Sequence, residues 1–235
     1  TCALPIYVGR VRENNEDAFW VGQSCLVVCD GMGGHLAGEV ASNLAIQTVK
    51  DYPFQGMDPK LEVQQAIERA QEHILEAASM EPTYTGMGTT ITLAWITPCE
   101  DGGAELTIGH VGDSRGYVLV NGVLTQLTTD HSVVGELVRS GTITFQEAQE
   151  HAKRHVLTQA LGSQEIQVEI IQAHLPSDSL VLLCTDGLTD VVDDAQIMTL
   201  LNRASQAENV VQDLANFANE LGGPDNITVI VAQVP

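Results

Sequence analysis

The first third of the chain alternates short apolar runs with longer amphipathic segments. The runs AFWV at 18–21 and CLVVC at 25–29 are separated by three residues, GQS, which predicts a β-hairpin. Apolar positions then recur at helical spacing over 36–49 and over 60–79, so each of these segments is predicted to be an amphipathic helix. The loop at 52–59, which contains two prolines and a glycine, separates the two helices.

β-strand patterns dominate the middle and the end of the chain. Asn121-Gly122 is a strong signal for a tight hairpin turn between two of these strands. The predicted strands are 89–96, 104–111, 116–120, 123–127, 168–175, 179–184 and 226–234.

Three helical regions are predicted among these strands. Residues 132–161 are polar and predicted to be helical, and Thr144 with Glu147 forms a capping box within them. Asp193 and Ser205 are predicted to cap two further helices near the C-terminus. The helices are grouped in pairs and do not alternate strictly with strands. This grouping indicates an α+β fold in which helices cover antiparallel sheets.

The composition excludes several classes of protein. The 235 residues suffice for one domain with a full core, and 44% of them are hydrophobic, which is not typical of a disordered chain. The formal net charge of −21, from 31 acidic and 10 basic residues, argues against binding to nucleic acid or to an anionic membrane. The five cysteines form no CxxC pair, and the sequence shows no secretory signal. We therefore expect a cytoplasmic protein.

Acidic residues stand at the ends of several predicted strands. Asp17 precedes the first strand of the N-terminal hairpin and Asp30 follows the second, so antiparallel pairing would bring both to one edge. Asp186 follows a later strand and Asp225 precedes the last one, and these two carboxylates also meet if their strands pair antiparallel. Asp113 closes a further strand.

Two interpretations of these acids remain open. Aspartate is common at strand ends because its side chain bonds the backbone of turns, and this explains any single position. A cation explains the set of five better, because clustered carboxylates repel one another unless positive charge lies among them. Oxygen ligands of this kind suit Mg²⁺, Mn²⁺ or Ca²⁺, and they do not suit zinc.

The glycine-rich segment after Asp30 distinguishes a metal site from a nucleotide-binding loop. A dinucleotide-binding loop would need glycine at position 36, where the chain has Leu36, and a Walker loop would need a Gly-Lys-Ser/Thr sequence that is absent. The small residues more plausibly let the backbone approach a metal, with the Gly31 carbonyl free to act as a ligand.

Eight motifs occur in the order found in one enzyme family. They are GRVRENNEDAF, DGMGGHLAGE, MGTTIT, GHVGDSRGYVL, LTTDHS, LTQALG, LLCTDGLTD and GGPDNITVIV, and the match as a whole runs from Gly9 to Val234. In these motifs the chain resembles the bacterial metal-dependent Ser/Thr protein phosphatases of type 2C, the PPM family. The resemblance implies one phosphatase domain over 1–235. It also implies a four-layer α-β-β-α sandwich with two central antiparallel sheets and a flap subdomain at about 131–158.

The resemblance further implies a centre of two Mn²⁺ or Mg²⁺ ions. Asp30 would bridge the two ions and take part in catalysis, Asp186 and Asp225 would complete one site, and the Gly31 carbonyl would serve the other. The metal-binding residues implied in this way are Glu16, Asp17, Asp30, Gly31, Asp113, Asp186 and Asp225.

Other implied roles concern the substrate and the outer part of this centre. Glu16 and Asp17 would hold metal-bound waters or ligate directly, and Asp113 would contribute to a third, weaker ion. Arg12 would grip the substrate phosphate through its planar fork of donors. His35 is the nearest candidate to protonate the leaving alkoxide, and a metal-bound water is the alternative acid.

The implied function is hydrolysis of phosphoserine and phosphothreonine in proteins by a metal-activated water, opposing Ser/Thr kinases in bacterial signalling. We expect phosphorylated proteins as substrates, no nucleic-acid or membrane partner, and a monomer. The alternative is a catalytically silent module that binds phosphoproteins, and loss of a core metal aspartate would mark it, but none is lost here. One departure from the family is Tyr7, which stands where members usually carry aspartate, and TCALPIY fits the expected first strand poorly.

Overall fold

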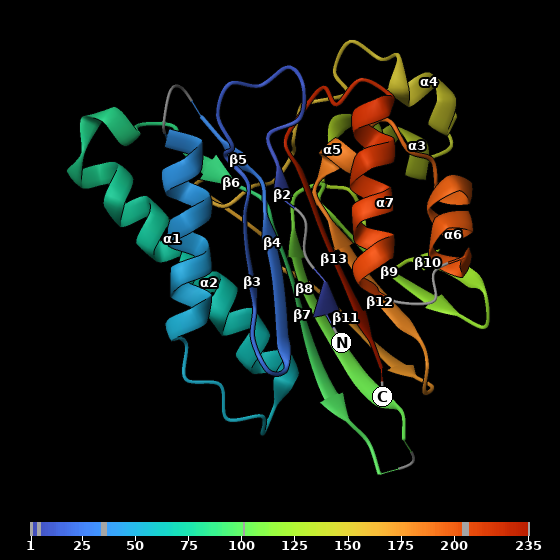
Figure 1. Ribbon diagram of the computed structural model, residues 1–235. Coiled ribbons are helices and arrows are strands. Elements are labelled where there is room, and N and C mark those ends of the chain that lie inside the picture. Colours follow the sequence, from blue (N-terminus) through green and yellow to red (C-terminus); the bar gives the residue numbers. More distant parts are fainter. Residues whose placement is uncertain (1, 4–5, 34–36, 101, 204–206, 235) are drawn as a thin grey trace.

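The protein is described here by a computed structural model, which covers residues 2–3, 6–33, 37–100, 102–203 and 207–234. Two antiparallel β-sheets pack face to face at its centre, and helices cover both outer faces (Figure 1). The predicted α+β sandwich with two central antiparallel sheets is therefore confirmed.

The first sheet has the strand order β1-β13-β12-β9-β10, with β2 pairing with β13 as well. Its strands are β1 (Cys2–Ala3), β2 (Ile6–Tyr7), β9 (Arg115–Val120), β10 (Val123–Gln126), β12 (Leu180–Cys184) and β13 (Ile227–Gln233). The N-terminal segment thus does add two short strands to this sheet, although its sequence fitted a strand poorly.

The second sheet has the order β11-β8-β7-β4-β3, and a small two-stranded sheet, β5-β6, lies beside it. Its strands are β3 (Ala18–Val21), β4 (Cys25–Cys29), β7 (Ile91–Pro98), β8 (Ala104–Val111) and β11 (Glu169–Leu175), and the small sheet consists of β5 (Gly31–Met32) and β6 (Gly88–Thr89).

Each sheet carries its own pair of helices. Helices α1 (Ala37–Asp51) and α2 (Pro59–Met80) pack on the sheet that contains β7, and α6 (Asp194–Arg203) and α7 (Ala207–Glu220) pack on the sheet that contains β12. The remaining helices are η1 (Pro82–Tyr84), α3 (Val133–Arg139), α4 (Phe145–Gln149) and α5 (Asp186–Thr189). Among the described residues, no helix is both long enough and apolar enough to cross a bilayer.

Helix α2 shows how local sequence fixes an element. The Asp58 carboxylate caps it by accepting a hydrogen bond from the Leu61 amide (3.2 Å), and Pro59 occupies the first turn, where its missing N–H costs nothing. Its buried stripe recurs every three or four residues and faces α1 and the sheet; its members are Val63, Ala66, Ile67, Ala70, Gln71 and Ile74.

The central core fills the space between the two sheets. Ile108 from one sheet and Leu183 from the other are fully buried in it, together with Ile230. Inward-facing residues alternate along each strand with residues that face the helices, so both faces of both sheets are covered. This packing fixes the positions of the strand ends.

Two predicted elements differ from the structure. Residues 132–161 form only the short helices α3 and α4, which have one fully buried side chain between them, Ala148, so little packing supports a longer helix there. The predicted strand 89–96 is split at Thr90, whose amide turns away from the ladder and donates to the carbonyl of Asp30 (2.9 Å).

The inter-sheet core predicts a large stability loss in Leu183→Ala. The side chain has no exposed surface, so the truncation leaves a cavity and should lower the free energy of unfolding by about 2–5 kcal/mol in urea denaturation. The matched control is Val123→Ala in β10, which is 61% exposed and should change stability by less than about 0.5 kcal/mol. Equal effects in the two variants would contradict this view of the core.

Candidate metal centre

The strand register brings the predicted acids to one end of the sandwich. Ala18 pairs with Cys29, so Asp17 and Asp30 lie next to each other just beyond that pair. β12 and β13 are antiparallel neighbours, which meets the condition set above, and therefore Asp186 and Asp225 also leave their sheet at the same end. Figure 1 shows β5, β6, α5 and the helices α3 and α4 at this end, in the upper part of the view.

A cleft of about 1300 Å³ opens at this end. Arg12 and the backbone around Gly31 lie in its wall. The acidic residues that line it are Glu16, Asp30, Asp113, Asp130, Asp186, Asp190 and Asp225. Of the predicted metal-binding residues, the structure brings all except Asp17 to the cleft surface.

Asp17 lies behind the cleft wall. Its side chain is buried, and its Oδ2 accepts hydrogen bonds from the hydroxyls of Thr185 (2.9 Å) and Thr228 (2.6 Å). Its Oδ1 is buried without a hydrogen-bond partner among the described residues. Burial raises the pKa of this carboxyl to about 7, although the two hydroxyls oppose the shift.

The backbone around Asp30 is held from two sides. The Asp30 amide donates to the Thr90 hydroxyl (2.9 Å), and that hydroxyl also contacts the Ser114 hydroxyl (2.7 Å), next to Asp113. At Gly31 a β-carbon would lie 2.3 Å from the carbonyl oxygen of Gly38, so only glycine fits between α1 and the hairpin.

Each carboxyl group of this cluster makes ionisation of its neighbours less favourable. Burial, followed by the charges of Asp186, Asp17 and Asp113, raises the pKa of Asp30 well above its usual range. Burial and the neighbouring charges of Asp113 and Asp190 do the same for Asp186. The pKa of Asp113 is raised to about 7 by burial and by nearby acids.

These observations test whether the residues fit hard divalent cations. Oδ1 of Asp186, like Oδ1 of Asp17, is buried and has no hydrogen-bond partner among the described residues. Buried carboxylate oxygens normally have hydrogen-bond partners. A bound cation would also offset the repulsion among the carboxylates at this site. Carboxylate and carbonyl oxygens are also the ligands that Mg²⁺ and Mn²⁺ prefer, so the donor set fits such ions.

Arg12 lies at the cleft rim and contacts Asp225, which is far from it in the sequence. Its Nη2 donates to Oδ2 of Asp225 at 2.6 Å, and the Arg12 side chain is 53% exposed. This contact raises the pKa of the arginine. The guanidinium therefore remains accessible to a ligand while one of the predicted metal aspartates orients it.

Sequence reasoning missed two residues that shape this site. The side-chain Nδ2 of Asn226 donates to the carbonyls of Val8 and Asn14 (both 2.9 Å), and its Oδ1 accepts from the backbone amide of Glu16 (2.8 Å), which ties the N-terminal loop to Asp225. The sequence feature that could have predicted this role is the position of Asn226 directly after Asp225.

Asp190 is the second missed residue. It lines the cleft four positions after Asp186, a spacing that puts both on one side of a helical turn, and its Oδ2 lies 3.8 Å from Nδ1 of His155. His155 also lines the cleft. His35, the predicted acid, lies outside the described residues.

Comparison with known proteins shows the class of this chain. The sequence profile described as "Protein phosphatase 2C" matches residues 10–222. The chain therefore belongs to the protein phosphatase 2C family, as the resemblance implied.

The relatives are bacterial serine/threonine phosphatases. The chain is 40% identical over 228 residues to PstP of Mycobacterium tuberculosis. The aligned region covers 96% of this chain but only 43% of PstP. It is 35% identical over 237 residues to the phosphatase stp of Listeria innocua, covering 96% and 92% of the two chains.

Solved structures agree with this assignment. A crystal structure of M. tuberculosis PstP superposes with a TM-score of 0.91 at 37% identity, covering 100% of this chain and 98% of that one. The catalytic domain of PstP, solved in complex with two manganese ions, gives a TM-score of 0.90 at 36% identity and covers 99% and 97% of the two chains.

The raised carboxyl pKa values predict how the metal-free protein responds to pH. The pKa values of Asp17 and Asp113 are about 7 in the folded state and 3.8 as ordinary carboxyls. Their protonated forms thus stabilise the fold, and this contribution is present below about pH 4 and is lost as the pH rises through about 7. In EDTA, the melting temperature should fall over that range.

Added Mn²⁺ provides the matched comparison. The cation favours the ionised carboxylates, so it should raise the melting temperature more at neutral pH than under acidic conditions. A Mn²⁺ effect that is equal at all pH values, or stability in EDTA that rises with pH over the same range, would contradict the predicted carboxylate cluster.

Proposed function

We propose that this chain hydrolyses phosphoserine and phosphothreonine in proteins and depends on two Mn²⁺ or Mg²⁺ ions. The observation that carries this proposal is the cleft lined by converging acids, in which a buried carboxylate oxygen of Asp186 finds no hydrogen-bond partner among the residues that the structure describes. The PstP structure with two manganese ions supports the choice of cation. We further propose that the protein acts in the cytoplasm and opposes a Ser/Thr kinase.

The metal ions would be held by oxygen atoms at the floor of the cleft. Asp30 would be shared between two ions, with Asp186 and Asp225 on one of them and the Gly31 carbonyl on the other. Glu16 lines the same floor, and Asp113 with Asp186 would hold a third, weaker ion. Asp17 lies behind the floor, and its buried Oδ1 has no hydrogen-bond partner in the described part of the chain, so we assign it a supporting part in this set.

The bound cations would supply positive charge for the phosphoryl oxygens and would lower the pKa of water near the phosphorus. The protein's own contribution is positioning. Thr90 and Ser114 hold the backbone of Asp30 and the turn at Asp113 in place. Asn226 holds the loop that carries Glu16. The floor is therefore organised before a substrate enters, which is what electrostatic catalysis requires.

Arg12 would bind the substrate phosphate. Its guanidinium fork matches a phosphate group, and half of its surface is free while Asp225 fixes its direction. His35 stays the predicted donor of a proton to the leaving serine or threonine oxygen. The single domain over 1–235, the monomeric state and the absence of nucleic-acid and membrane partners also stay predictions.

Metal dependence is the first test of this function. p-Nitrophenyl phosphate and a phosphothreonine peptide should both be hydrolysed with Mn²⁺ or Mg²⁺, and activity should disappear in EDTA. Asp186→Ala should lower kcat by more than about a hundredfold, because a metal ligand is lost. The matched control is Asp213→Ala, an exposed aspartate on α7, which should keep full activity.

A folded protein that hydrolyses neither substrate with any divalent ion would refute this activity. If such a protein still bound phosphopeptide tightly, the alternative function, a silent phosphoprotein-binding module, would replace the phosphatase.

Arg12 gives a separate prediction. Arg12→Ala should lower kcat/KM by about 10²–10³-fold because a donor to the developing phosphoryl charge is lost. Arg12→Lys should recover only part of this, because a lysine provides charge without the two-pronged geometry. Arg10→Ala, a nearby exposed arginine outside the cleft lining, is the control.

The half-saturating Mn²⁺ concentration should be measured for all three arginine variants. A change confined to the Mn²⁺ requirement would mean that Arg12 acts only by holding Asp225, and not on the substrate.

A further inference from the structure

The flap, residues 131–158, forms one wall of the cleft but has almost no core of its own. The whole segment 133–158 is described, and Ala148 is its single buried residue. None of the side chains of helix α3 is fully buried. A helix of this length is not stable alone, so specific contacts with the body of the protein must set the position of the flap.

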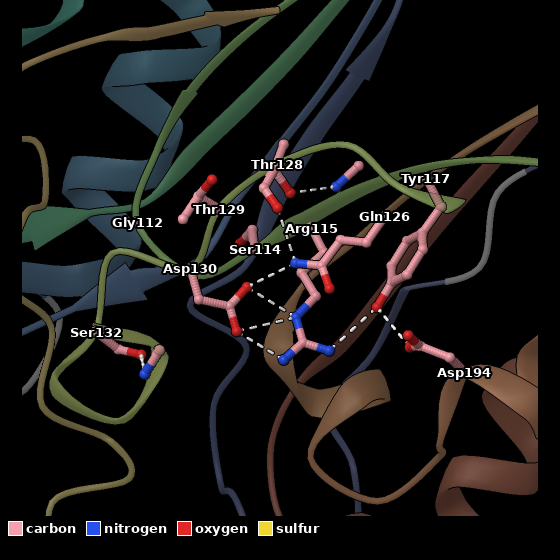
Figure 2. Close-up of polar contacts among 12 residues, drawn as sticks. Gly112, Ser114, Arg115, Tyr117, Gln126, Thr128, Thr129, Asp130, Ser132 and Asp194 are labelled. Carbon is pink, nitrogen blue, oxygen red and sulfur yellow. Dashed lines mark hydrogen bonds and ion pairs between the residues drawn. The ribbon is translucent and has the colours of Figure 1, made fainter. Parts of the chain in front are cut away.

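Arg115 makes the strongest of these contacts at the root of the flap. It is the first residue of β9, two positions after Asp113, and it faces Asp130, which directly precedes the flap (Figure 2). Its Nε lies 2.9 and 3.1 Å from the two oxygens of Asp130, and its Nη2 lies 2.6 Å from Oδ2. Gln126 adds a further donor to Oδ1 of Asp130 at 3.0 Å.

The same guanidinium reaches two other elements. Its Nη1 donates to the Tyr117 hydroxyl (3.1 Å), which in turn donates to Asp194 at the start of α6 (3.0 Å), as Figure 2 shows. Its Cζ also lies 5.8 Å from the centroid of the Phe145 ring in α4, the second helix of the flap. Arg115 therefore joins the sheet, the flap root, a flap helix and α6.

Burial makes this arrangement stronger than a surface ion pair. The Arg115 and Asp130 side chains are only 12% and 17% exposed, and the pair is bidentate. Two further ion pairs between flap and body, His131 to Glu169 at 3.9 Å and His155 to Asp190 at 3.8 Å, are both longer, and the His155 side chain is 56% exposed. Among the described residues, Arg115 is thus the contact best suited to hold the flap in one position.

The position of the flap matters more for a large substrate than for a small one. Phe145 and Val156 are flap residues that line the cleft and expose 42% and 46% of their surface. A phosphorylated protein segment has to pass along this wall and can cover these apolar side chains. A small aryl phosphate can reach the acids at the floor without touching the wall.

We propose that Arg115 is a positioning residue which, through Asp130 and Phe145, holds the flap wall in place and thereby favours phosphorylated protein segments over small phosphate esters. This inference rests on the proposed phosphatase function. It assigns to Arg115 no contact with the reacting phosphate.

The test compares two substrates in Arg115→Lys, which keeps the charge but loses the fork. The kcat/KM for a phosphothreonine peptide should fall about tenfold more than that for p-nitrophenyl phosphate. Hydrogen exchange of the free protein should become faster across 133–158, while the core strand β8 stays protected. The matched control is Arg139→Lys, the same substitution on an exposed flap arginine, which should change neither readout.

Phe145→Leu keeps the inference testable if Arg115→Lys folds poorly, because Phe145 is partly exposed and does not belong to the core. It should speed exchange in the flap, and its effect on the substrate ratio should not add to that of Arg115→Lys. If Phe145 only touched the peptide directly, exchange in the free protein would not change.

Three outcomes would overturn the inference: an equal loss for both substrates, an unchanged flap exchange, or fully additive effects of the two variants. Failure of the phosphatase function itself is separate, because the wild-type protein would then hydrolyse neither substrate. The exchange measurement needs no activity and would still report whether Arg115 holds the flap.

Discussion

Repulsion among carboxylates confined to one end of two packed sheets is the constraint on which the rest of this structure depends. Asp30 and Asp186 are pressed together with Asp113 nearby, and each of these groups has a pKa raised by burial and by its neighbours. Such carboxyls stay ionised together only where a compensating charge lies among them, and otherwise they hold protons. The packed core, the tight turn at Gly31 and the family's metal chemistry can all be understood from this requirement.

The core supplies the rigidity that holds the acids together. The strands that carry them meet in two antiparallel sheets whose inner faces bury side chains such as Ile108 and Leu183 completely. Because dense cores deform little, the strand ends keep their spacing even when the charges oppose it. Hydroxyl contacts such as Thr90 with Ser114 extend this order to the turns that carry Asp30 and Asp113.

The flap is organised by the opposite principle. Between 133 and 158 it has a single fully buried side chain, and polar contacts at its root hold it against the body, with the Arg115–Asp130 pair the most buried ion pair among them. The floor keeps its geometry through a dense core, whereas the wall keeps its position through a few contacts of this kind.

The sequence by itself determined the strands, most of the helices and the acids at the strand ends, because side-chain periodicity and turn chemistry are local properties. The hairpin of 18–21 and 25–29 and the carboxylates of Asp17 and Asp30 follow from such patterns. Only the tertiary structure decided that Asp17 lies behind the cleft and that Asp190 lines it. The same holds for Arg12 and Asp225, which meet across 213 positions. Sheet order and side-chain packing set such distances, and no short stretch of sequence encodes them.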